Sequence, residues 1–356
     1  MLQLLVIFTG GTIGSRRSGE GIDVHASGSY ALIDAYNNSG LHRSDVTLTA
    51  VQPLNLLSEN LTPDDWIALA TAIREADHSA YDGIVVTHGS DTLAYSAALL
   101  GYLFADAKLP VVLTASNYPL EDERSNGLRN FSCSIDFIAD ACLPGVFAVY
   151  EDDKGSPHVY IGTRITQAVS FTDQFGSPYG ITYGRMEQGR FQWHDHPHNP
   201  MPESLRSASK AGLEWEPGTL KLEDGIVYIK PYPGLNYSYY DFSERRPKAV
   251  LHDLHHSGTA SAIRKGPYSL PQFIADCRAL DIDVYICPIK DRSAALYASS
   301  LRLIEAGAVI LENMSMEAAV TKLMLAYGFY SDRAEAEAFM TGTSVYFERN
   351  EVRHAD

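Results

Sequence analysis

Two polar turns, each placed directly after a short apolar run, constrain the fold of this chain more than any other feature. The first turn, Thr9-Gly10-Gly11-Thr12-Ile13, follows the run 4–8, and the second, His88-Gly89-Ser90-Asp91-Thr92, follows the run 83–87. Short apolar runs that end in turn residues are typical of buried strands. Because open α/β sheets bind their ligands at the carboxyl ends of the strands, both turns are expected at one ligand-binding edge.

Hydroxyl groups and glycine backbone dominate these turns, a combination that suits acyl transfer. Thr12 is the expected nucleophile, because Gly10 and Gly11 permit tight backbone geometry and the close approach of a substrate. Ser90 offers a second hydroxyl, and Asp91 offers a carboxylate that can accept a substrate ammonium group. A simpler interpretation stays open for Thr12 and for Asp91, since either residue could cap the helix that follows it.

Length and composition indicate a soluble globular protein with two domains. The chain has 356 residues, of which 45% are hydrophobic and 20% charged, so it can bury a sizeable core. Its formal net charge of −16 argues against binding to nucleic acid or to an anionic membrane surface. There is no run of 18 apolar residues, so we expect no transmembrane helix, and we interpret the N-terminal apolar run as a strand and not as a signal peptide.

Cysteine and histidine usage predicts no metal site. The four cysteines lack paired metal spacing and stand in apolar surroundings, which fits reduced core thiols of a cytoplasmic protein. They are Cys133, Cys142, Cys277 and Cys287. His194, His196 and His198 alternate around an Asp and a Pro, but no distant partner with ligand spacing accompanies them. We therefore favour a solvated connector over a zinc site in that segment.

Apolar strands alternate with helical periodicity as far as about residue 180, which predicts a doubly wound, mainly parallel sheet. The expected strands are 2–8, 46–51, 83–87, 109–114 and 145–150, and the expected helices are 62–76, 91–104 and 125–141. Thr62 as N-cap, followed by Pro63 and two acidic residues, marks the start of the first of these helices.

The pattern dissolves over 188–225 and then resumes, which predicts a large domain at 1–187, a connector at 188–225 and a smaller α/β domain at 226–356. The strands expected in the smaller domain are 226–230, 249–254, 283–288 and 308–311. Its expected helices are 270–280, 294–306, 315–328 and 332–341. The fold class is therefore α/β, with a large N-terminal doubly wound sheet and a second, smaller α/β domain.

Four segments together carry a resemblance to a known family: 9–14, Ser58-Glu59-Asn60-Leu61, 88–92 and 114–127. At these residues the chain resembles the bacterial L-asparaginase family, and its cytoplasmic type I branch in particular. The resemblance covers most of the chain and implies two α/β domains assembled as a homodimer or homotetramer. The chain differs from the usual pattern within these segments, where the family has Thr for Ser90, Gly for Ala115, Gln for Asn117 and Asp for Asn126.

The resemblance also implies which residues form the site. Catalysis would fall to Thr12, Ser90 and Asp91, and Ser58 would hold the substrate carboxylate, although a plain loop serine is the simpler interpretation of Ser58. The residues expected to contact the substrate are Gly11, Ile22, Ser58, Glu59, Gly89, Ser90, Asp91, Ala115 and Gln167. His255 and His256 occupy a turn that, in the family, reaches toward a neighbouring subunit's active site; an exposed surface turn is the alternative.

Both groups that handle protons in the family are altered here. Gln167 stands at the position of the family's triad Lys, and an amide can neither deprotonate nor supply positive charge. The position of the family's lid Tyr is Ile22 by type I spacing or His25 by the longer type II spacing, and Tyr30 is a further candidate. Of these, His25 is the expected catalytic group. The polar, Gly- and Ser-rich segment 14–30 is either a mobile lid or an inert surface loop.

Three functions fit these features. The chain is expected to be an asparaginase-like amidohydrolase without a cofactor, which cleaves a side-chain carboxamide of an amino acid or peptide through a Thr acyl-enzyme. A rearranged proton relay makes plain L-asparagine an unfavourable substrate, and a slow asparaginase is the second possibility. The third is a catalytically impaired homologue that binds or senses an amino acid.

Overall fold

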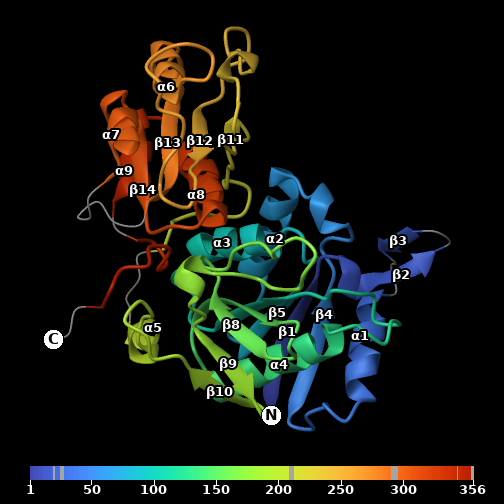
Figure 1. The fold of residues 1–356 in the computed structure, drawn as a ribbon. Helices are drawn as coiled ribbons and strands as arrows, with labels where there is room; N and C mark the ends of the chain where they lie inside the picture. Colours follow the sequence, from blue (N-terminus) through green and yellow to red (C-terminus); the bar gives the residue numbers. More distant parts are fainter. Residues whose placement is uncertain (19–20, 25–27, 208–211, 290–295, 343, 354–356) are drawn as a thin grey trace. The chain divides into compact units, whose positions relative to one another are not determined.

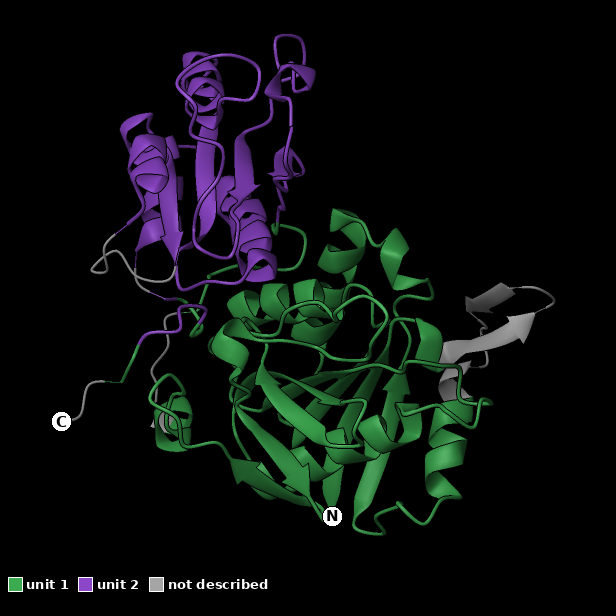
Figure 2. Cartoon of the chain, viewed as in Figure 1, with its two compact units in different colours: residues 1–220, 345–347, 352–356 green, residues 221–344, 348–351 purple. Residues whose placement is uncertain are grey.

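The chain divides into two units, which Figure 2 colours separately. The computed structural model describes all residues except 19–20, 25–27, 208–211, 290–295, 343 and 354–356, and between 14 and 30 it describes only backbone elements. Unit 1 comprises 1–220, 345–347 and 352–356, whereas unit 2 comprises 221–344 and 348–351. None of the helices within these described ranges is long and apolar enough to cross a membrane.

The large sheet of unit 1 has the strand order β10-β9-β8-β7-β6-β5-β1-β4 (Figure 1). Its parallel strands are β1 (Leu2–Phe8), β4 (Val46–Val51), β5 (Gly83–Thr87), β6 (Pro110–Thr114) and β7 (Gly145–Glu151). β5, β6 and β7 are buried along their whole length, which explains why they read as continuous apolar runs and do not alternate. The antiparallel strands β8 (Pro157–Ile161), β9 (Gly184–Glu187) and β10 (Arg190–Trp193) extend the sheet beyond β7.

Helices lie on both faces of this sheet. They are α1 (Gly28–Asn37), α2 (Pro63–Glu75), α3 (Leu93–Leu103) and α4 (Gly127–Ala141), with the short α5 (Pro202–Ser207) farther along. Three 3-10 turns, η1 (Thr12–Gly14), η2 (Ser58–Asn60) and η3 (Pro178–Gly180), and the hairpin β2 (Ser15–Ser18) and β3 (Gly21–Val24) complete the described elements of unit 1. The expected start of α2 is confirmed, because the Thr62 side chain and Asp65 form a reciprocal capping box.

The crossover helices reveal a change of hand. α1 packs on α4, with the rings of Tyr36 and Phe131 5.4 Å apart, so these two helices share one face of the sheet. The step from β1 to β4 and the step from β6 to β7 run in opposite directions along the sheet. Two crossovers that run in opposite directions on one face must have opposite hands, so one of them departs from the usual right-handed rule.

Unit 2 contains a smaller parallel sheet with the order β11-β12-β13-β14. Its strands are β11 (Ile226–Ile229), β12 (Ala249–Asp253), β13 (Asp283–Ile289) and β14 (Val309–Glu312). Its helical segments are η4 (Tyr237–Tyr239), α6 (Leu270–Ala279), α7 (Ala298–Glu305), α8 (Met316–Phe329) and α9 (Arg333–Thr341). The predicted fold class is confirmed: a large, mainly parallel sheet and a second, smaller parallel sheet.

Several elements were not expected from the sequence. The antiparallel strands β8 and β9, helix α1 and the β2–β3 hairpin have no counterpart among the expected elements. The segment expected to be a connector, 188–225, begins with β10, which pairs with β9 in the large sheet, and it also contains α5. Short half-exposed strands such as β10 bury too few side chains to show a clear hydrophobic pattern.

Candidate active site

Three turns pack backbone against backbone where β1, β4 and β5 end. Gly10 and Gly11 have φ angles of +99° and +69°, a conformation that glycine adopts without strain. A Cβ atom on Gly10 would lie 2.5 Å from the Leu56 carbonyl oxygen, and one on Gly11 would lie 2.5 Å from the Gly89 nitrogen. Ser58 packs on Gly89, where a Cβ atom would lie 2.6 Å from the Ser58 Cβ. The contacts bring the two predicted motifs and the Ser58 segment to one sheet edge.

Thr12 and Ser58 both offer hydroxyls at this edge. Thr12 is half-buried and is the first residue of η1. Ser58 is only 4% exposed, and among the described residues its hydroxyl has no hydrogen-bond partner. Because buried hydroxyls in native proteins are nearly always hydrogen-bonded, the Ser58 hydroxyl is suited to a polar group of a ligand.

Asp91 and Glu59 make the site acidic. Loss of solvent around Asp91, and then the nearby Glu59 carboxylate, raise the pKa of the Asp91 carboxyl above its ordinary value. Asp91 does not cap α3, since the N-cap is Thr92 and no side chain caps that helix. Thr92 instead donates its hydroxyl to the Ser58 carbonyl at 3.0 Å. Two carboxylates without a capping role favour a cationic ligand group.

A buried chain of hydrogen bonds supports the second turn, and the sequence did not reveal it. The Nδ1–H of His88 donates to the Gly89 carbonyl at 2.8 Å, so the Nε2 accepts from the Ser96 hydroxyl, also at 2.8 Å. The Trp66 indole then donates to the Ser96 oxygen at 2.7 Å. Burial lowers the pKa of His88 to about 4, so the ring is neutral at physiological pH.

Gln167 lies within reach of the second turn. Its Oε1 accepts from the Tyr95 hydroxyl at 3.2 Å, and its Nε2 donates to the Asp91 carbonyl at 3.3 Å. These partners fix which end of the amide faces Asp91. The structure therefore places Gln167 beside Asp91, as the resemblance implied, and identifies Tyr95 as a neighbour that sequence reasoning missed.

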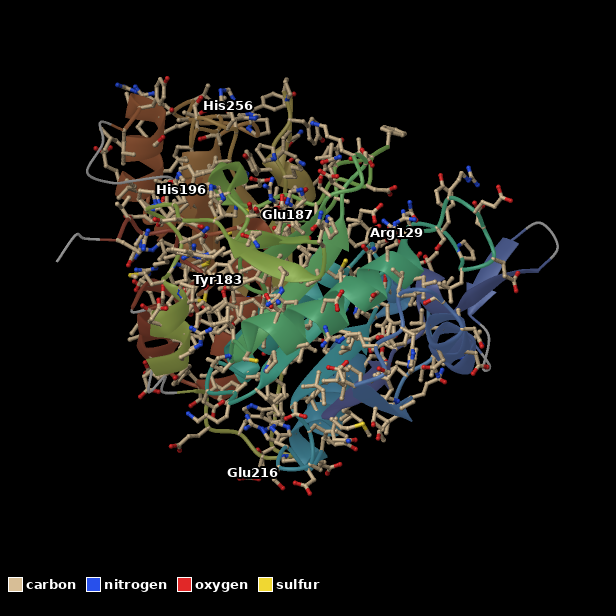
Figure 3. All side chains as sticks on the ribbon, turned by 90° about the horizontal axis from the view of Figure 1, so that it is seen from below. Arg129, Tyr183, Glu187, His196, Glu216 and His256 are labelled. Carbon is tan, nitrogen blue, oxygen red and sulfur yellow. The ribbon has the colours of Figure 1, made fainter. Side chains whose placement is uncertain are left out.

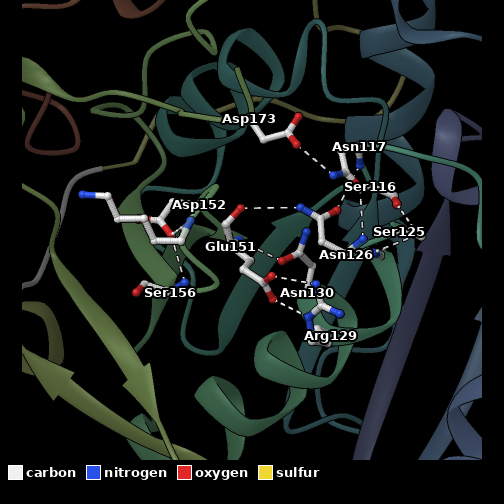
Figure 4. Close-up of polar contacts among 12 residues, drawn as sticks. Ser116, Asn117, Ser125, Asn126, Arg129, Asn130, Glu151, Asp152, Ser156 and Asp173 are labelled. Atoms are coloured by element: carbon white, nitrogen blue, oxygen red, sulfur yellow. Dashed lines mark hydrogen bonds and ion pairs between the residues drawn. The ribbon is translucent and has the colours of Figure 1, made fainter. Parts of the chain in front are cut away.

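A polar network underlies the Ala115 segment (Figure 4). Ala115 is fully buried, and its carbonyl accepts from the Asn130 amide at 2.9 Å. Arg129, near the start of α4 (Figure 3), binds Glu151 through two hydrogen bonds of 2.6 and 2.7 Å. Arg124 pairs with Asp122 on the surface. Hydrogen bonds thus join the residue after β6 to α4, and α4 to β7.

The structure does not describe the side chains of the three residues that are candidates for the lid position. His25 lies outside the described residues. The backbone of Ile22 forms part of β3, opposite Arg17 in β2, and the backbone of Tyr30 forms part of α1, but the side chains of both are not among those described. The choice among these three residues for the lid position therefore stays a prediction.

The histidine cluster of unit 1 forms a row of rings. The ring of His196, which is labelled in Figure 3, lies 5.6 Å from that of His194 and stacks at 5.4 Å on that of His198. The His196 Nδ1 accepts from the His198 backbone N–H at 3.2 Å, which commits this nitrogen to the turn itself. In unit 2, His255 closes a turn by donating its N–H to the Thr259 carbonyl at 2.8 Å, and His256 is exposed.

Comparison with known proteins finds L-asparaginases and also glutamyl-tRNA(Gln) amidotransferase subunits D, such as that of Pyrococcus furiosus, which is 26% identical over 348 residues and covers 95% of this chain and 74% of that protein. The family model described as "Asparaginase, N-terminal" matches residues 3–199. The L-asparaginase of Thermococcus kodakarensis is 27% identical over 358 residues, covering 95% of this chain and 97% of that protein. L-asparaginase 1 of Escherichia coli strain K12 is 28% identical over 338 residues, covering 90% of each chain. The structure of the thermostable L-asparaginase from T. kodakarensis aligns over 98% of this chain and 99% of its own, with a TM-score of 0.77 and 25% identity.

Proposed function

This chain belongs to the asparaginase family, and we propose that it hydrolyses a side-chain carboxamide of an amino acid or peptide through an acyl-enzyme on Thr12. The observation that carries the proposal is the packing of Gly11 and Ser58 against Gly89. It brings a candidate nucleophile, an unpartnered buried hydroxyl and the Asp91 carboxylate to one sheet edge. Family membership supports amide hydrolysis as the reaction class.

The acidic side chains of the site suit the α-ammonium group of an amino-acid substrate, and the Ser58 hydroxyl suits its α-carboxylate. Asp91 and Glu59 would bind the α-ammonium group, and a bound cation would return the raised pKa of Asp91 toward its ordinary range. The Ser58 hydroxyl would donate to the α-carboxylate. The side-chain carboxamide would then extend toward Thr12.

Hydrolysis would proceed in two steps. The Thr12 Oγ attacks the carboxamide carbon, and backbone N–H groups near Thr12 and Gly89 stabilise the oxyanion. The proton from the Thr12 hydroxyl passes to the leaving nitrogen, so that the C–N bond breaks and ammonia or an amine departs. Water, activated near Ser90, then attacks the ester and releases the acid and the free Thr12 hydroxyl. Gln167 can orient a substrate or water by hydrogen bonding, but it cannot transfer a proton. We therefore propose that plain L-asparagine is turned over slowly. We also propose that the active protein is a homodimer or homotetramer, as the family resemblance implies.

A non-catalytic amino-acid-binding protein is the second candidate. The observation that favours it is the hydrogen bonding of Gln167, whose amide binds the Tyr95 hydroxyl and the Asp91 carbonyl. By the family resemblance, a Lys would supply a positive charge at this position. In that case the same acidic site would bind an amino acid and no acyl-enzyme would form.

A turnover assay with free and N-substituted amides of asparagine and glutamine tests the proposal, with intact-mass detection of an acyl-enzyme. We expect hydrolysis of at least one amide and its loss in a folded Thr12→Ala variant. Thr47→Ala is the matched control, since Thr47 is exposed on β4. Retained activity in Thr12→Ala would refute the nucleophile. Binding of an amino acid without turnover of any amide would favour the second candidate.

A further inference from the structure

The loop that carries Gln167 is an internally bonded unit. The backbone N–H of Thr166 donates to the Gly176 carbonyl at 2.9 Å, and Gly176 donates back at 3.3 Å. Inside the loop, the N–H of Val169 donates to the Gln174 carbonyl at 3.0 Å. A loop closed in this way moves as one piece, so a contact at one end affects the position of the other end.

Asp173 fastens the far end of this loop. Its Oδ2 accepts from the Asn117 Nδ2 at 2.8 Å (Figure 4). Its backbone N–H donates to the Asp153 carboxylate at 2.9 Å. Asn117 is therefore a neutral donor between the Gln167 loop and the turn that follows β6. Its acceptor, the Asp173 carboxylate, is charged, and a charged acceptor strengthens the hydrogen bond.

Asn117 is itself held in one orientation. Its Oδ1 accepts from the backbone N–H groups of Tyr118 and Asn126, at 2.9 and 3.0 Å. In return, the Asn117 backbone N–H donates to the Asn126 Oδ1 at 3.0 Å. The acceptor end of the Asn117 amide is committed to this turn, and only the donor end is available to Asp173. The turn after β6 also carries Ala115, so one side chain links two segments of the candidate site.

We propose that Asn117 is a positioning residue, which holds the Gln167 loop against the Asp91 turn through its hydrogen bond to Asp173. The proposal rests on the proposed function for its effect on the reaction, while its effect on the loop is independent of turnover. Gln167 reaches the Asp91 carbonyl at 3.3 Å, near the limit of a hydrogen bond, so a small displacement of the loop would break that contact.

A swap of the two side chains tests the proposal. Asn117→Asp keeps both contacts to Tyr118 and Asn126 but sets a carboxylate against Asp173, and like charges at this distance repel. Asp173→Asn keeps an acceptor oxygen and should have little effect. The double variant Asn117→Asp with Asp173→Asn restores one donor and one acceptor. Asn37→Asp is the matched control, since it adds the same charge at an exposed site.

Hydrogen–deuterium exchange of the 166–176 peptide is the first readout. We expect faster exchange in Asn117→Asp and a return to the wild-type rate in the double variant. The second readout is kcat and KM for the best amide: a loss of about 10- to 100-fold in kcat/KM is expected for Asn117→Asp, recovered in the double variant.

Each outcome decides the proposal. Wild-type exchange in Asn117→Asp, or a double variant no better than that single variant, would overturn it. If the wild type hydrolyses no amide, the proposed function fails, and the exchange rates alone then support or overturn the role of Asn117.

Discussion

At the level of single residues, the site depends on what glycine lacks. Gly11 and Gly89 meet without side chains, and Ser58 fills the space that a side chain on Gly89 would need. The buried Ser58 hydroxyl has no hydrogen-bond partner among the described residues, and the His88 ring donates to the Gly89 carbonyl. The chemistry at this edge therefore rests on backbone proximity as much as on the hydroxyls.

Gly89→Ala is predicted to abolish turnover and to destabilise unit 1 by about 1–3 kcal/mol. The added Cβ would lie 2.6 Å from the Ser58 Cβ, so Ser58 or the turn must shift. Denaturant unfolding and the amide assay measure the two effects. Gly40→Ala is the control, because a Cβ atom on Gly40 would meet no other atom within 4 Å. Equal activity of both variants would contradict the packing argument.

The pH dependence of stability should report His88. Its pKa is about 4 in the folded protein, against an ordinary value of about 6.5. As the pH falls below 6.5 the unfolded chain binds a proton that the folded protein does not bind until about pH 4. Stability should therefore fall across this window, by about 1.4 kcal/mol per pH unit and about 3 kcal/mol in total.

Tryptophan fluorescence during urea unfolding measures this change in unit 1, since Trp66, Trp193 and Trp215 all lie there. His88→Asn should flatten the dependence between about pH 6.5 and about pH 4, whereas His42→Asn, at an exposed histidine, should not. An unchanged slope in His88→Asn would show that other groups dominate acid destabilisation.

At the level of elements, the sequence was sufficient to predict the bounds of a helix or strand that has its own capping residues or its own continuous apolar run. β1, β4 and β5 begin and end where the apolar runs predicted, and α2 begins at its Thr-Pro cap. The antiparallel strands β8 to β10 were missed because their side chains are partly exposed and their pairing is set by neighbouring strands.

Thr62→Ala is predicted to destabilise unit 1 by about 1 kcal/mol without lowering amide turnover. The side chain of Thr62 accepts from the Asp65 N–H, and the Asp65 carboxylate accepts from the Thr62 N–H at 2.9 Å. Thr62→Ser keeps the hydroxyl and should be close to wild type. Chemical unfolding followed by tryptophan fluorescence measures the difference, and equal losses in both variants would argue against a capping effect.

At the level of the whole molecule, the C-terminal segment contributes to both units. Residues 345–347 belong to unit 1, where the Tyr346 hydroxyl accepts from the Val146 N–H at 2.7 Å. Residues 348–351 belong to unit 2, where Glu348 pairs with Lys322 at 2.6 Å and both side chains are fully buried. Burial lowers the pKa of Lys322, and the Glu348 carboxylate opposes that shift.

Lys322→Met is predicted to destabilise unit 2 by about 3–5 kcal/mol, because it removes the ammonium group that compensates the buried charge of the Glu348 carboxylate. Lys322→Met combined with Glu348→Leu should recover most of that loss. Urea unfolding followed by circular dichroism measures both variants, with Lys221→Met as the exposed control. A double variant as unstable as the single one would show that the pair contributes more than charge compensation.

The α/β class, the parallel strands of both sheets, most helix bounds and the family could all be predicted from the order of residues. These features depend on local hydrophobic periodicity, caps and short motifs, which are written in consecutive residues. Only the tertiary structure showed that Gly11 and Ser58 pack on Gly89, and that the buried His88 ring is neutral. It also showed that Asn117 forms a hydrogen bond with Asp173 in the Gln167 loop. The opposite hands of two crossovers likewise emerged only from the folded chain. Those facts depend on packing between distant segments, and no local pattern encodes a contact such as that of Asn117 with Asp173, whose partners are 56 residues apart.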